Sequence, residues 1–84
     1  MNDIIIYTTR YCHYCLRAKY LLEEKNAEFT EIAVDNDPEL RQEMAEKSGR
    51  NTVPQIWIGD LHVGGCNELF TLNYSGQLDR LLAS

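Results

Sequence analysis

The hydrophobic pattern of this chain changes its period in a regular order. The apolar run from Ile4 to Tyr7 predicts a strand over residues 3–7, and apolar side chains then recur at helical spacing within residues 13–25. The inward positions of that helix are Cys15, Ala18, Leu21 and Leu22. Residues 29–34 alternate between polar and apolar side chains, which is typical of a half-buried strand. The chain therefore begins as strand, helix and strand.

A second helix is marked by the residues at its two ends. Asp37 can accept a backbone N–H at the helix start, Pro38 suits the first helical position, and Gly49 can end the helix. Leu40 and Met44 are its expected core contacts. The polar turn before Asp37 separates this helix from the second strand.

A hairpin and two short helical stretches complete the pattern. Residues 53–58 predict a strand, with Ile56 and Trp57 as core candidates, and a Gly-Asp turn leads into a second strand over residues 61–63. His62 on that strand is expected to be exposed and structural. Helical spacing returns in two places after the double glycine. These stretches are residues 66–72 and residues 75–82, the latter with Leu78, Leu81 and Leu82 facing inward.

The element order β-α-β-α-β-β-α predicts an α/β fold. The first β-α-β unit requires parallel strands with a right-handed connection, and the last two strands are antiparallel to each other. A four-stranded mixed sheet with the first strand in its interior and helices on both faces satisfies these demands. The 84 residues are enough for one small core, so we expect a single domain over residues 1–84.

Composition narrows the setting. The net charge is −5 and no basic stripe exists, which argues against nucleic acid as a partner. No apolar stretch approaches the length of a membrane span, and Met1-Asn2-Asp3 does not resemble a basic leader. Three cysteines without an export signal favour a reducing compartment, so we expect a cytoplasmic protein with no membrane partner.

The candidate chemistry lies in Cys12-His13-Tyr14-Cys15, where the first strand gives way to the first helix. Two thiols at this spacing and position are typical of a redox-active dithiol. The helix N-terminus stabilises a nearby anion by about 0.3–1 kcal/mol at an exposed site. Amide hydrogen bonds from Tyr14 and Cys15, and the cations Arg10 and His13, are candidates for further stabilisation of a Cys12 thiolate. We expect Cys12 to be the exposed nucleophile and Cys15 to be shielded and protonated.

Three motifs together resemble those of glutaredoxins, which have the thioredoxin fold. They are Tyr11-Cys12-His13-Tyr14-Cys15, Thr52-Val53-Pro54-Gln55 and Gly64-Gly65-Cys66-Asn67-Glu68-Leu69. The resemblance covers nearly the whole chain and implies a glutathione-dependent thiol–disulfide oxidoreductase. Cys12 would attack protein disulfides and glutathione mixed disulfides, and Cys15 would resolve the intermediate. Glutathione would be the cosubstrate, with no metal or nucleotide required, and disulfide-bonded or glutathionylated proteins would be the partners of a monomer.

The same resemblance implies a groove for glutathione. Val53-Pro54 would be a cis peptide, with the Val53 N–H and C=O pairing with the cysteinyl backbone of the ligand. The helix start after the double glycine would receive the γ-glutamyl carboxylate; an ordinary strand-to-helix turn capped by Asn67 is the alternative interpretation. The groove residues would be Arg10, Tyr14, Thr52, Val53, Pro54, Gly65, Cys66 and Asn67.

Several positions depart from the family pattern. His13 replaces a usual proline, Thr9 replaces a frequent lysine, and Asn67 replaces a common aspartate for which Glu68 could substitute. His13 could tune the thiolate or be a spacer. Cys66 is expected to be a buried or semi-buried thiol that glutathione could modify.

Other functions compatible with these motifs stay open. Glutaredoxins whose active-site proline is replaced can hold an iron–sulfur cluster between two protomers, using Cys12 and glutathione, so a cluster carrier is the alternative function. A zinc site would need Cys66 or a histidine beside the single C-x-x-C pair. A redoxin recycled by thioredoxin reductase is a third possibility, against which the residues after the double glycine argue.

Overall fold

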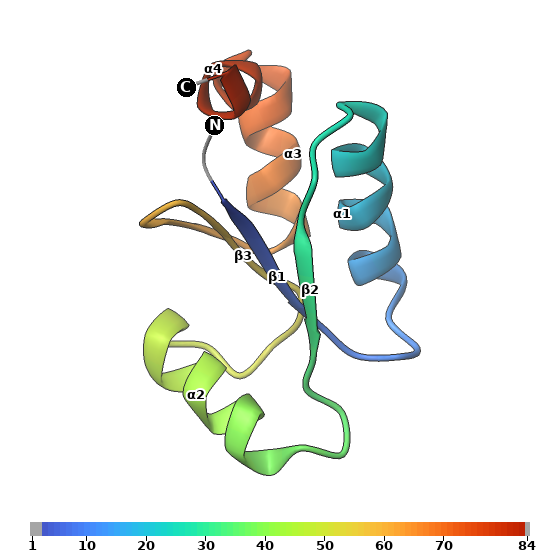
Figure 1. Ribbon diagram of the computed structural model, residues 1–84, viewed down its shortest axis with the longest axis vertical. Helices are drawn as coiled ribbons and strands as arrows, with labels where there is room; N and C mark the ends of the chain where they lie inside the picture. The colour runs from blue at the N-terminus through green and yellow to red at the C-terminus, as the bar shows by residue number, and fades with distance from the viewer. Residues whose placement is uncertain (1–2, 84) are drawn as a thin grey trace.

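The computed structural model describes residues 3–83, so residues 1–2 and 84 of the predicted domain lie outside the described part. Figure 1 shows the elements in chain order. They are β1 (Ile4–Thr8), α1 (His13–Glu24), β2 (Thr30–Ala33), α2 (Pro38–Ser48), β3 (Gln55–Ile58), β4 (Leu61–Gly64), α3 (Cys66–Tyr74) and α4 (Gln77–Ala83). The two helical stretches predicted after the double glycine are the separate helices α3 and α4, with the turn at Ser75-Gly76 between them, so the observed order has one helix more than β-α-β-α-β-β-α.

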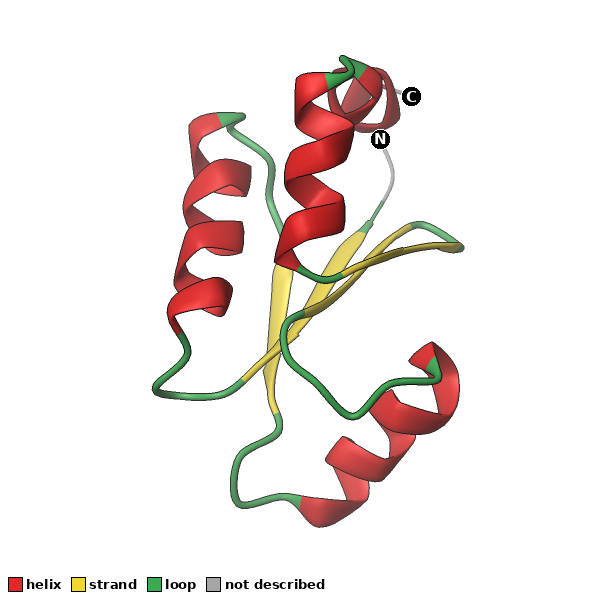
Figure 2. Cartoon of the chain, turned by 180° about the vertical axis from the view of Figure 1, so that it is seen from behind, coloured by secondary structure: helices red, strands yellow, loops and turns green. Residues whose placement is uncertain are grey.

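The four strands form one mixed sheet in the order β2-β1-β3-β4. Strand β1 is parallel to β2 and antiparallel to β3, and β3 is antiparallel to β4. Helices α1 and α3 lie side by side on one face, whereas α2 lies on the other (Figures 1 and 2). This arrangement confirms the predicted α/β thioredoxin fold with β1 in the interior of the sheet.

Strand β1 contributes to the cores on both faces of the sheet because its side chains alternate. Ile4 and Ile6 pack with the buried residues of α1, α3 and α4. Tyr7 and the half-buried Ile5 belong to a smaller cluster with Met44 of α2. The four inward positions predicted for α1 are all buried (Cys15, Ala18, Leu21 and Leu22).

Two predictions about the strands are corrected. Strand β3 begins at Gln55 rather than at Val53, because Pro54 has no N–H to donate to the sheet ladder. Trp57 is half-buried rather than fully buried, and it packs against the smaller cluster on the α2 face. The centroid of its ring lies 5.4 Å from that of Tyr7, in an edge-to-face contact.

The ends of α2 agree with the sequence signals. The Asp37 carboxylate accepts a hydrogen bond from the Leu40 N–H at 3.1 Å, and Pro38 occupies the first helical position. Gly49 ends the helix in the left-handed conformation, with φ 75°, and donates its N–H to the Ala45 carbonyl at 2.8 Å. These contacts fix the end of α2 from which the loop to β3 departs.

The start of α3 is held differently from the predicted cap. Its N-cap is Gly65 rather than Asn67, and the Glu68 carboxylate accepts a hydrogen bond from the Gly65 N–H at 2.7 Å. Gly64 has φ 114°, and a Cβ there would lie 2.6 Å from Glu68 Oε1. The close approach of Glu68 therefore depends on glycine at position 64.

None of the helices within residues 3–83 is long and apolar enough to cross a membrane.

Alanine substitutions at two glycines with positive φ should test how much the Glu68–Gly65 contact contributes to stability. Gly49→Ala meets no atom within 4 Å, so it should cost only the left-handed strain of about 1–2 kcal/mol. Gly64→Ala carries at least that strain, because φ 114° lies outside the left-handed well, and it also displaces Glu68 from the Gly65 N–H, so its loss should be larger. Urea denaturation of both variants measures the two losses in unfolding free energy. Equal losses would mean that the Glu68–Gly65 contact contributes nothing to stability.

Candidate active site

Cys12 is the N-cap residue of α1, at the point where the loop from β1 enters the helix. Its side chain accepts a hydrogen bond from the Cys15 N–H at 3.2 Å. Its sulfur also lies 3.9 Å from the Val53 carbonyl oxygen, on a loop that is 41 residues away in the sequence. Cys12 is partly exposed, as a nucleophile requires. An amide donor and a helix start thus both face this sulfur.

Cys15 lies on the inward side of α1. The side chain is only 1% exposed, and its burial raises the pKa of the Cys15 thiol to about 12, with a further contribution from the hydrogen bond to Cys12. The thiol therefore keeps its proton at neutral pH. The two cysteines differ as predicted, since Cys12 is accessible and Cys15 is shielded.

A groove runs from Tyr14 to the start of α3. The peptide between Val53 and Pro54 is cis, as the resemblance implied. Seven residues predicted for the groove are among those that line it, and the others are Arg50 and Glu68. The predicted residues found there are Tyr14, Thr52, Val53, Pro54, Gly65, Cys66 and Asn67. Their glutathione-binding role stays a prediction.

Arg10 does not share this groove. The side chain is exposed and lies in a separate polar hollow with Thr9, Lys19 and Glu31. The Arg10 backbone N–H donates to the Asp35 carboxylate at 3.2 Å, which ties this loop to the end of β2. The loop therefore places Arg10 outside the groove.

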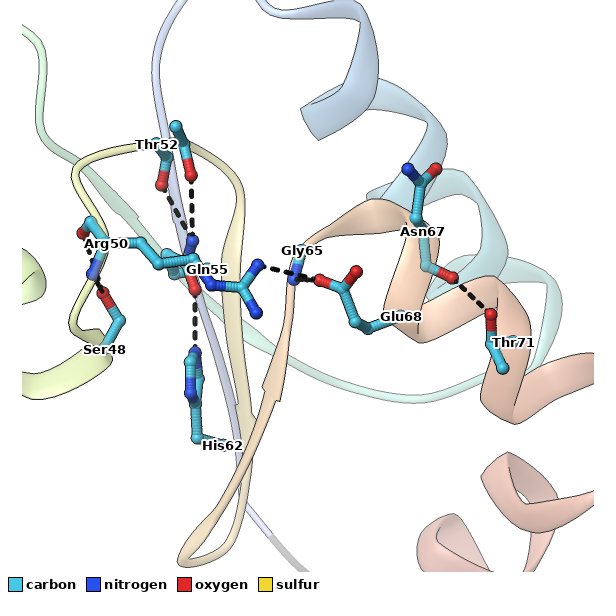
Figure 3. Close-up of polar contacts among 9 residues, drawn as sticks. All are labelled: Ser48, Arg50, Thr52, Gln55, His62, Gly65, Asn67, Glu68 and Thr71. Carbon is cyan, nitrogen blue, oxygen red and sulfur yellow. Dashed lines mark hydrogen bonds and ion pairs between the residues drawn. The ribbon is translucent and has the colours of Figure 1, made fainter.

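Arg50 was not assigned to the groove from the sequence, and Glu68 was named there only as a possible substitute for the aspartate that Asn67 replaces. Arg50 and Glu68 form an ion pair at 3.1 Å, and the same Glu68 oxygen accepts the Gly65 N–H (Figure 3). The Gly65 hydrogen bond first, and the Arg50 guanidinium next, lower the pKa of the Glu68 carboxyl below its ordinary value. Glutamate three residues after an N-cap was an available signal, whereas nothing in the local sequence distinguishes Arg50.

Asn67 and Cys66 occupy the first turn of α3. The Asn67 side chain is exposed and does not cap the helix, and its backbone carbonyl accepts a hydrogen bond from Thr71 Oγ1 at 3.0 Å (Figure 3). The capping interpretation of Asn67 is therefore wrong. Cys66 is 4% exposed, and burial raises the pKa of its thiol.

His62 is half-buried, which corrects the prediction of an exposed side chain. Its ring stacks on that of Trp57, with 4.6 Å between the ring centroids, and its Nε2 lies 2.7 Å from the Gln55 side-chain oxygen. Strand β4 is at the edge of the sheet, but Trp57 and the buried Gln55 on β3 provide a surface that covers the ring.

No three His, Cys, Asp or Glu side chains gather within residues 3–83 in a group that could hold a metal ion. The reactive groups of the site are the two cysteine thiols. An accessible Cys12 sulfur at a helix start, with a protonated Cys15 one turn inside, can attack a disulfide and then resolve the mixed disulfide. This fold and this dithiol define a thiol–disulfide oxidoreductase.

Comparisons with known proteins agree with that class. The family model described as Glutaredoxin matches residues 4–63. A glutaredoxin from Pseudomonas aeruginosa is 56% identical over 84 residues, with 100% of each chain covered. The chain belongs to the glutaredoxin family.

Solved structures of the family are similar throughout the chain. The solution structure of a glutaredoxin from Brucella melitensis has a TM-score of 0.87 at 60% identity, covering 98% of this chain and 89% of that one. The crystal structure of a buckwheat glutaredoxin–glutathione complex has a TM-score of 0.89 at 28% identity, covering 98% and 77%.

The lowered pKa of Glu68 predicts a pH-dependent contribution to stability. Because the folded pKa lies below the unfolded one, this stability is present above the ordinary value of 4.5 and is lost as pH falls through the folded pKa. Glu68→Gln should therefore be less stable than the parent at pH 7, and the difference should shrink in acid. Urea denaturation from pH 7 to pH 3 measures it. Glu28→Gln removes an equal charge from an exposed loop and controls for net charge. A difference that does not change with pH would contradict the assignment.

Proposed function

We propose that this chain is a glutathione-dependent thiol–disulfide oxidoreductase that reduces protein disulfides and glutathione mixed disulfides. The observation that carries the proposal is the position of Cys12. Its sulfur caps α1 and lies 3.9 Å from the Val53 carbonyl, at the side of a groove that reaches the N-terminus of α3. The glutathione complex of the buckwheat relative supports the choice of cosubstrate.

The reaction with a glutathione mixed disulfide needs only Cys12. The Cys12 thiolate attacks the glutathione sulfur, forms a Cys12–glutathione disulfide and releases the protein thiolate. A second glutathione thiolate then attacks the glutathione sulfur of that disulfide, which frees Cys12 and yields oxidised glutathione. Each turnover consumes one free glutathione, because the other half of the oxidised glutathione is the glutathionyl group of the substrate, and no metal or nucleotide is required.

Reduction of a protein disulfide uses both cysteines. The Cys12 thiolate attacks one sulfur, forms a mixed disulfide with the protein and releases the other sulfur as the first protein thiolate, which can take up a proton. Cys15 then gives up its proton, attacks the Cys12 sulfur and releases the second protein thiolate. The raised pKa of Cys15, which burial causes first and the Cys12 hydrogen bond and charge increase, keeps this thiol protonated while Cys12 acts as the nucleophile. Once Cys12 is part of the mixed disulfide, its charge no longer opposes ionisation of Cys15. Two glutathione molecules reduce the resulting Cys12–Cys15 disulfide.

The groups along the groove suit an extended tripeptide. The Val53 N–H and C=O would pair with the cysteinyl backbone of glutathione, beside Tyr14. The γ-glutamyl carboxylate would be received by N–H groups at the α3 start, which is a favourable place for an anion. Glu68 already accepts the Gly65 N–H, so the N–H groups of Cys66 and Asn67 are the proposed anion donors.

With this function, we expect the protein to act as a monomer in the cytoplasm. Its partners would be glutathione and disulfide-bonded or glutathionylated proteins. A carrier of an iron–sulfur cluster, held by Cys12 and glutathione between two protomers, is the alternative. The exposed His13 in place of the usual proline supports that alternative. The absorbance spectrum of freshly purified protein separates the two, because only a bound cluster absorbs visible light.

Serine replacements should separate the roles of the two thiols. Cys12→Ser should abolish all activity, because it removes the accessible nucleophile. Cys15→Ser should keep the reduction of glutathione mixed disulfides but lose the reduction of protein disulfides, since only the second reaction needs a resolving thiol. An assay coupled to glutathione reductase measures both. A Cys12→Ser protein that still turns over mixed disulfides would refute the assignment of the nucleophile.

Asn67→Ala should raise KM for glutathione-containing substrates severalfold and leave attack on a small non-glutathione disulfide almost unchanged. The substitution keeps the Asn67 backbone N–H and removes the exposed side-chain amide, which lines the groove and would bond the γ-glutamyl amine. A lost hydrogen bond to a charged group costs at most about 1.5–3 kcal/mol, and only substrates that carry the group lose it. Asn73→Ala, on the last turn of the same helix, is the matched control. Equal losses on both substrate types would show that Asn67 supports the helix and does not bind the ligand.

A further inference from the structure

A wholly buried glutamine connects the far side of the hairpin to the groove. Gln55 has no exposed surface, and every polar atom of its side chain is hydrogen-bonded (Figure 3). Its Nε2 donates to the Thr52 carbonyl at 3.1 Å and to Thr52 Oγ1 at 3.2 Å. Its Oε1 lies 2.7 Å from His62 Nε2. Because the Thr52 carbonyl can only accept, the amide nitrogen must face Thr52, and His62 Nε2 must donate to Gln55.

The two ends of this chain of hydrogen bonds differ in how firmly they are held. The His62 ring stacks on Trp57, whose own ring contacts Tyr7 of the central strand. Thr52 is an exposed residue of the loop between α2 and β3, and it lines the groove. The next residue, Val53, carries the carbonyl that lies 3.9 Å from the Cys12 sulfur. The rigid end is therefore in the sheet, and the end that needs support is at the groove.

We propose that His62 and Gln55 are positioning residues of the active site: they hold Thr52, and with it the Val53 backbone, in place opposite Cys12. Neither residue lines the groove or touches the Cys12 sulfur. When the Thr52 and Val53 backbone is already ordered, binding of an extended peptide loses less conformational entropy, because the ligand does not have to immobilise the loop. The inference rests on the proposed function in one respect, which is that glutathione is the peptide bound along this edge.

A hydrogen bond, rather than a charge, is the means by which His62 acts. The groups that face its ring are Trp57, Gln55, Arg50 and Glu68. Burial lowers the pKa of His62, the Arg50 cation lowers it further, and the Glu68 carboxylate opposes both. The imidazole is therefore neutral at pH 7. Protonation in acid would add a proton at Nδ1 and leave the Nε2–H bond to Gln55 intact.

The test uses two near-isosteric substitutions. His62→Phe keeps a flat ring over Trp57 and deletes the donor, and Gln55→Met keeps the side-chain length and deletes all three hydrogen bonds. Each should raise KM for a glutathione mixed disulfide by about tenfold, which corresponds to about 1.4 kcal/mol. Turnover of a small non-glutathione disulfide should change by less than about twofold, since that substrate does not use the Val53 backbone. Leu61→Phe, on the neighbouring exposed position of β4, is the matched control.

The double variant and a rescue decide whether His62 acts through Gln55. In the Gln55→Met background, His62→Phe should raise KM no further, because the contact through which it acts is already gone. His62→Gln, which restores a side-chain N–H donor, should recover most of the affinity. In the NMR spectrum of His62→Phe, the Gln55 side-chain amide should exchange faster with solvent, and the Thr52 and Val53 backbone signals should shift.

Three outcomes would overturn the inference. The first is an unchanged KM in both single variants, and the second is additive effects on KM in the double variant. The third is a loss of activity that is equal on the glutathione and non-glutathione substrates and parallels the loss of stability. Failure of the proposed function would be visible in the parent protein, as an absence of saturable turnover with the glutathione substrate. In that case the NMR comparison still decides the positioning role, because unchanged Thr52 and Val53 signals in a folded variant would refute it.

Discussion

The structure depends on the burial of β1 between two layers of helices. Alternate side chains of this strand enter two cores, so β1 can neither slip by one residue nor move to the edge of the sheet. Its end at Thr8 therefore has a fixed place, and α1 begins a few residues later. Because the inward face of α1 packs on that strand, Cys12 stays at the helix start, and Cys15 stays buried beneath it. The difference between the two thiols is thus a consequence of core packing.

The groove is assembled from segments that meet only through the sheet. The Thr52–Pro54 loop is placed by β3, which pairs with β1, and the α3 start is placed by β4, which pairs with β3. Polar contacts then hold each edge of the groove. Glu68 holds the α3 start through the Gly65 N–H, and Gln55 holds Thr52. Both contacts use side chains that are at least partly buried, where hydrogen bonds have fewer competing water molecules.

The amount that could be predicted differs between the elements and the polar contacts. The spacing of apolar residues was sufficient to predict the strands and the buried face of α1, because buried positions recur with the period of each element. Asp37, Pro38 and Gly49 were sufficient for the ends of α2, because caps are local in sequence. The alternative interpretation of Asn67 as the cap of α3 was wrong, since the N-cap is Gly65, and His62 was expected to be exposed. Only the second error concerns surroundings from another element, because His62 is covered by Gln55 and Trp57 of β3, whereas the Gly65–Glu68 contact is local in sequence.

The sequence by itself determined the class of chemistry, since a C-x-x-C pair between a strand and a helix start is a local pattern with few other uses. The tertiary structure alone decided which polar residues accompany it. Arg10 is two residues before Cys12, yet the loop carries it away from the groove, whereas Arg50 is 38 positions further along and lines it. The physical reason is that the direction of an exposed side chain depends on loop geometry and on partners distant in the chain. Neither leaves a periodic signal in the sequence.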